Sequence, residues 1–162
     1  MKLSPSMDID IQMVATVTDK NGKVVQEVRR KNITATVGRE DLAARLVDLA
    51  NTTDLGVAKY GAVGTGLTSP IESDTQLSAE THRVAIVAEH CTSVGNVATI
   101  VFTFSGSWTG TSYEAGIFMG ASATAVADTG RLLVRSLFPS GLAKTDPSHN
   151  LTVSWTVTLT DI

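Results

Sequence analysis

The 162-residue chain has one cysteine, few aromatic residues and little charge. The single cysteine, Cys91, excludes an intrachain disulfide and any metal site built from several thiolates. Aromatic residues make up 5% and charged residues 18% of the chain, against about 25% charged residues in an average soluble domain. Hydrophobic residues nevertheless reach 43%, without a heptad pattern, so the composition excludes a disordered chain and a coiled coil. This length predicts one domain over residues 1–162.

Charge is scarce mainly in the second half of the chain. Residues 1–81 carry 9 basic and 11 acidic side chains, whereas residues 82–162 carry 4 and 5. The formal net charge of −3 provides no basic surface for nucleic acid or for an anionic membrane. We expect the second half to cover itself with Ser, Thr and Gly, or to hide its surface against another protein.

Long apolar runs are also absent. Residues 90–113 contain no Asp, Glu, Lys or Arg, but polar residues interrupt them before they reach the length of a membrane span. The sequence reaches Asp8 before any apolar run, so we expect no signal peptide and synthesis in the cytoplasm.

Thr and Val are abundant, with 22 and 18 residues, and both favour β-strands. Residues 9–17 alternate apolar and polar side chains, which predicts a strand with one buried face. Asn21-Gly22 then predicts a hairpin turn, and residues 23–31 return as a charged strand suited to a sheet edge. We interpret residues 1–31 as an N-terminal hairpin arm.

Residues 39–51 form the one segment with a helical pattern. Leu42, Leu46 and Leu49 recur there at i, i+4 and i+7, which predicts a short amphipathic α-helix. Because one helix cannot cover both faces of a sheet, a doubly wound α/β fold is excluded.

Residues 58–162 indicate short strands divided by turn residues. The expected strands cover residues 59–63, 83–91, 97–105, 112–119, 131–138 and 151–159. We expect Pro139-Ser140-Gly141 to end the fifth of them. The spacing of these strands predicts a mainly β fold, an antiparallel, jelly-roll-like β-sandwich.

The candidate chemical motifs are incomplete. Residues 61–66 (GAVGTG) lack the Lys-Ser/Thr of a phosphate loop and do not open a helix, so we expect glycines that let a strand end approach its neighbours closely. His82, His90 and His149 have no partner at metal-binding spacing, so we expect no metal site. Cys91 is interpreted as a small buried hydrophobic residue.

The acidic residues of the second half are widely spaced, and no pair is placed for glycoside hydrolysis. Glu114 interrupts an apolar strand, where a charge needs a partner, and we expect a pair with Arg131 or Arg135. No enzyme signature results from these residues, and we predict neither a catalytic activity nor a cofactor.

Several short segments occur in an order that resembles one group of proteins. They lie at residues 18–23 (TDKNGK), 31–33 (KNI), 60–66 (YGAVGTG), 73–77 (SDTQL), 114–118 (EAGIF), 130–135 (GRLLVR) and 151–157 (LTVSWTV). Their order over residues 12–160 resembles small virion structural proteins of tailed bacteriophages, described as head decoration, head-fibre or tail-fibre-like β domains. Such proteins imply no catalytic residues.

The resemblance implies a phage virion protein, and the low charge favours a capsid decoration (cement) protein that binds and stabilises the assembled major-capsid shell. We expect a homo-oligomer, a trimer, on the capsid surface at a symmetry axis. No nucleic acid and no membrane are expected as partners. The predicted partner contacts are Ile9, Ile11, Met13, Arg29, Arg30, Trp108 and Tyr113.

Three alternatives remain open at this point. One is a tail-fibre or baseplate component. The second is a carbohydrate-binding module for host attachment that stacks Trp108 and Tyr113 on a sugar. The third is a hydrolase that uses Glu89 or Glu114.

Overall fold

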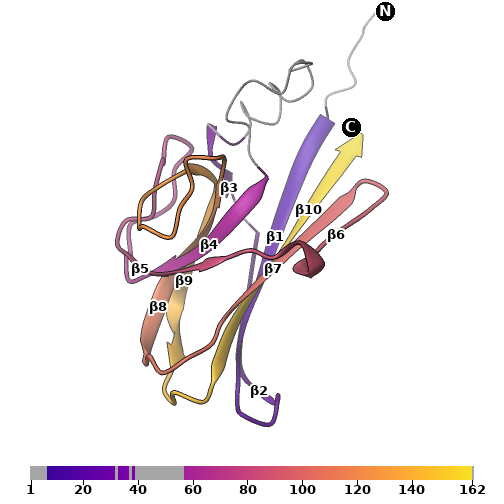
Figure 1. Cartoon of the computed structure of the whole chain (residues 1–162). Helices are drawn as coiled ribbons and strands as arrows, with labels where there is room; N and C mark the ends of the chain where they lie inside the picture. The colour runs from indigo at the N-terminus through magenta and orange to yellow at the C-terminus, as the bar shows by residue number, and fades with distance from the viewer. Residues whose placement is uncertain (1–6, 32, 37, 39–56, 162) are drawn as a thin grey trace, which may run out of the picture.

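The computed structural model describes residues 7–31, 33–36, 38 and 57–161 as two antiparallel sheets packed face to face (Figure 1). The helix expected at residues 39–51 lies outside the described residues. The first sheet has the order β2 (Val24–Lys31), β1 (Met7–Thr18), β10 (Asn150–Asp161), β7 (Val97–Phe104), β6 (Cys91–Val94). The second sheet has the order β3 (Ile33–Thr34), β9 (Arg131–Lys144), β8 (Gly110–Met119), β4 (Ala58–Gly64), β5 (Glu80–Ala85). The predicted antiparallel β-sandwich is confirmed.

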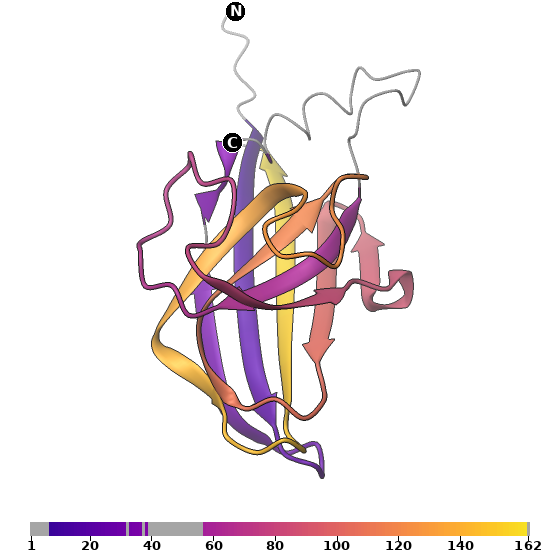
Figure 2. The same ribbon diagram turned by 60° about the vertical axis from the view of Figure 1, so that its left-hand side comes forward.

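The N-terminal hairpin is part of the first sheet. β1 lies between β2 and β10 and pairs with β10 along its whole length, from Met7 opposite Asp161 to Thr18 opposite Asn150 (Figure 2). The predicted N-terminal hairpin is confirmed by the antiparallel pairing of β1 with β2. The hairpin is not separate from the sandwich, because β1 is an inner strand of the first sheet. The prediction that the charged strand β2 lies at an edge is confirmed.

The inward row of β1 fills the space between the sheets. Ile11 and Met13 are 1% and 0% exposed and belong to the main core, together with Phe102 and Trp155 from β7 and β10. The two side chains face the opposite sheet, and Ile11 also lines a groove between the two sheets. Partner contact by Ile11 and Met13 stays a prediction.

The second sheet also has a buried outer face. The small outer core that forms there consists of Ala35, Ala62, Leu77, Phe118, Ala123 and Leu132. Leu77 and Ala123 come from the loops 65–79 and 120–130, so the chain itself covers this face. Because the chain's own loops cover β8 and β9, most residues of these strands are buried and few of them need charged side chains. This accounts for much of the low charge of residues 82–162 without a partner protein.

Two predicted strands have different bounds because of tertiary contacts. The expected strand 83–91 is interrupted, since β5 pairs with β4 in one sheet while β6 pairs with β7 in the other. The chain crosses between the sheets through the 3-10 turn η1 (Ala88–His90). β9 does not end at Pro139, because the register shift opposite Ser112 and Glu114 accommodates the proline without a ladder hydrogen bond.

Gly61 of β4 allows the two sheets to approach. A Cβ atom at this position would lie 2.3 Å from the Phe102 ring of the opposite sheet. Gly61→Ala should lower the free energy of unfolding by about 1–3 kcal/mol, because the ring has to move within a packed core. Urea unfolding measures this loss, and adding Phe102→Leu should recover part of it. Additive losses in the double variant would contradict the proposed contact.

Candidate functional site

The Glu114 carboxylate of β8 is completely buried and fully hydrogen-bonded. Its side chain is 0% exposed and accepts backbone N–H bonds from Gly66, Ser78 and Ala79 at 3.1, 3.0 and 2.8 Å. The Arg135 Nε atom donates to the same carboxylate at 2.8 Å. The predicted pairing of Glu114 with an arginine is confirmed, and Arg135 is the partner.

Arg135 of β9 extends this cluster to the loop 65–79. Its guanidinium donates to Asp74 Oδ2 at 2.7 Å, to the Thr68 carbonyl at 2.7 Å and to the Ser78 hydroxyl. The Glu114–Arg135 cluster therefore holds the loop against the second sheet. A carboxylate saturated in this way has no free lone pair directed at a substrate, so the cluster is structural rather than catalytic.

The glycines of residues 61–66 allow the loop to reach Glu114. A Cβ atom at Gly64 or Gly66 would lie 2.7 or 2.4 Å from Glu114 Oε1. Neither distance is compatible with a side chain, so both positions require glycine. The expectation that these glycines permit close approach is confirmed.

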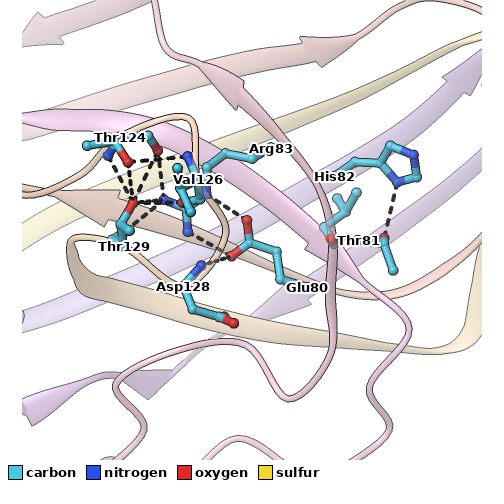
Figure 3. A network of polar contacts seen from close by, with 9 residues as sticks. Glu80, Thr81, His82, Arg83, Thr124, Val126, Asp128 and Thr129 are labelled. Carbon is cyan, nitrogen blue, oxygen red and sulfur yellow. Dashed lines mark hydrogen bonds and ion pairs between the residues drawn. The ribbon is translucent and has the colours of Figure 1, made fainter.

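A second ion pair holds the loop 120–130 (Figure 3). Arg83 and Glu80 of β5 form a bidentate pair with distances of 2.6 and 2.7 Å, and both side chains are almost fully buried. Arg83 Nη1 donates to the Thr129 carbonyl at 2.7 Å, and the Asp128 N–H donates to Glu80 at 3.2 Å. The guanidinium lies 4.1 Å from the centre of the Phe118 ring. This pair therefore joins β5, the loop and the outer core.

Lys144 at the end of β9 is a buried cation held mainly by carbonyl groups. It is 0% exposed, and its Nζ donates to the carbonyls of Gly106 and Trp108 at 2.8 Å, Pro147 at 3.0 Å and Asp146 at 3.3 Å. Burial lowers the pKa of Lys144, and the nearby Asp146 charge opposes that shift. The sequence analysis missed this residue, although a lone lysine in an apolar strand is a signal of the same kind as Glu114.

The described residues form an apolar groove of about 560 Å³ between the two sheets. We call it the inter-sheet groove. Its lining residues are Ile11, Val57, Ala58, Ile86, Ala88, Cys91, Thr92, Ser93, Ala98, Thr99, Ile100, Met119, Leu133 and Val157. Most of this lining is aliphatic, and Val57 at the mouth is 66% exposed. Cys91, expected to be buried, is half-buried in the groove wall. No sequence pattern predicts the groove, because its walls come from both sheets.

The predicted partner residues that remain do not form one site. Ile9 is half-buried and packs against the main core. Arg29 and Arg30 are exposed on β2, where Arg29 pairs with Glu27 at 2.8 Å. Partner binding by these two arginines stays a prediction.

Trp108 lies in the turn between β7 and β8, Tyr113 lies on β8, and both residues are half-buried. The Trp108 ring stacks on His82, with ring centroids 4.1 Å apart, and Lys144 Nζ lies 5.2 Å from its centroid. One face of this ring is therefore already covered by an internal contact, which leaves less of it for a sugar.

The described part of the chain contains no group of three or more His, Cys, Asp or Glu residues that could hold a metal ion. Within the same residues, no helix is long and apolar enough to cross a membrane. Glu89, the other candidate hydrolase residue, is exposed on the 3-10 turn η1. No family model, curated protein or solved structure matches the chain.

Glu114→Gln should lower the free energy of unfolding by about 3–5 kcal/mol, because it removes the fully buried charge partner of Arg135 and places amide donors opposite backbone N–H groups. Chemical denaturation measures this change. Glu27→Gln is the matched control, because its ion pair with Arg29 is 40% and 70% exposed and should contribute at most about 1 kcal/mol. Equal losses in the two variants would show that Glu114 does not hold the loop.

Proposed function

We propose that this chain is a structural protein of a tailed-phage virion, and specifically a capsid decoration protein that binds the assembled major-capsid shell. The order of the sequence segments over residues 12–160 suggests this class of protein. The structural observation that supports the proposal is the inter-sheet groove. A binding role fits an apolar surface that the described residues leave uncovered.

The inter-sheet groove suits the apolar side chains of a neighbouring protein subunit. Its walls present Ile86 from the segment after β5, Ile100 from β7 and Leu133 from β9. Val57 extends the apolar surface to the outside. Filling such a groove removes aliphatic surface from water, which contributes about 25 cal/mol per Å². If the partner surface exists only in the assembled shell, binding of this chain would stabilise that shell by mass action.

The polar groups of the fold support a binding role rather than chemistry. Glu114, Arg135, Glu80, Arg83 and Lys144 all have partners that hold loops or turns. These contacts give the protein a rigid shape, which lowers the entropy cost of binding.

The edge strand β2 is the second proposed contact. Arg29 and Arg30 are exposed there and could face acidic groups of a capsid subunit. A closed trimer at a symmetry axis, on the capsid surface, is part of the same proposal. A tail-fibre or baseplate position is the second candidate, since the same groove could take a tail protein.

Copy number in purified virions separates the two positions. A decoration protein should be present in hundreds of copies per particle, because it repeats with the capsid subunits. Quantitative gel densitometry against the major capsid protein measures this ratio. A few to a few dozen copies would contradict the capsid position and favour the tail.

Val57→Asp should weaken attachment to capsids more than about tenfold, because burying a carboxylate in the apolar groove costs well over the 1.4 kcal/mol that corresponds to a factor of ten. Sedimentation of the variant with undecorated capsids measures attachment. Val126→Asp is the matched control, since Val126 is also 66% exposed but lies on the loop 120–130, outside the groove lining. Equal binding by both variants would contradict the groove as the contact.

A further inference from the structure

We infer that His82, Trp108 and Lys144 form an acid-sensitive contact that holds two turns at one end of the sandwich and releases them when His82 becomes protonated. These three residues, called here the His82 stack, come from β5, from the turn between β7 and β8, and from β9. The inference does not depend on the proposed virion function.

The geometry places an imidazole and a buried ammonium group on the same indole. The His82 and Trp108 rings are nearly parallel, at an interplanar angle of 20°, with centroids 4.1 Å apart. Lys144 Nζ lies 5.2 Å from the centroid of the Trp108 ring. Phe104 meets the same indole edge-on at 6.5 Å, which connects the stack to the main core.

The ammonium group in turn holds two separate turns together. Gly106 and Trp108 supply carbonyls from the turn between β7 and β8. Asp146 and Pro147 supply carbonyls from the turn between β9 and β10. These four bonds make Lys144 the centre of this end of the fold, so whatever repels its charge loosens both turns.

Protonation of His82 would place a second positive charge beside Lys144. His82 is half-buried, so protons can reach its ring, and its Nδ1 atom lies 3.1 Å from the Thr81 hydroxyl, a neutral partner. Asp146 is the acidic group near Lys144, and its carboxylate is already engaged by Ser148. A neutral histidine therefore fits the stack better than a charged one.

The direction of the pKa shifts agrees with this geometry. Burial lowers the pKa of His82 below 6.5, and the positive charge of Lys144 lowers it further. An unfolded or open His82 therefore binds a proton at a pH where the stacked ring does not. The stabilisation provided by neutral His82 is complete above pH 6.5 and is lost as the pH falls through the lower pKa of the folded state.

Amide hydrogen exchange of the full chain tests the inference. At pH 5, after correction for the intrinsic exchange rate, peptides covering residues 105–110 and 145–149 should lose protection relative to pH 7.5. Peptides from the centre of β1 and β10 should keep theirs and serve as the internal reference. Wild-type turns that are equally protected at both pH values would overturn the inference.

His82→Phe is the decisive variant, because it keeps an aromatic ring against Trp108 but cannot gain a proton. Its two turns should be equally protected at pH 5 and pH 7.5. The same loss of protection in wild type and His82→Phe would assign the pH response to other groups. If His82→Phe does not fold, a histidine titration of the wild type by NMR decides: a His82 midpoint at or above 6.5 would overturn the inference.

Discussion

The buried charge of Glu114 is the constraint on which the second sheet depends. A carboxylate without solvent must have its charge and its oxygen atoms satisfied inside the protein. Arg135 supplies the charge, and the backbone N–H groups of Gly66, Ser78 and Ala79 supply the remaining donors. The loop 65–79 must therefore lie on the outer face of β8 and β9, where Leu77 completes the outer core.

This constraint changes the meaning of the low charge of the second half. The composition alone suggests a surface covered by other subunits. The structure shows that the loops 65–79 and 120–130 cover the outer face of the second sheet, with Arg83 and Glu80 holding the second loop. Among the described residues, the apolar surface left uncovered lies elsewhere, in the inter-sheet groove. The proposal of a binding partner therefore rests on that groove rather than on composition.

Local patterns predicted much of the fold. The alternation in residues 9–17 predicted β1 and its buried face. One charge in an apolar strand predicted that Glu114 pairs with Arg131 or Arg135, and the structure shows Arg135. The predicted strand at 83–91 was wrong because its two halves pair in different sheets, a choice that distant strands make. Pro139 did not end β9, since the partner strand β8 has a compensating irregularity there.

The sequence by itself determined the mainly β class, the edge position of the charged strand and the need for a partner to Glu114. Each of these follows from the period of side chains along a strand or from the cost of burying a charge. Only the tertiary structure decided that β1 is an inner strand of the first sheet, that Lys144 bridges two turns, and that the walls of the groove come from both sheets. These features join residues far apart in the chain, and their positions depend on packing and strand pairing that no local pattern contains.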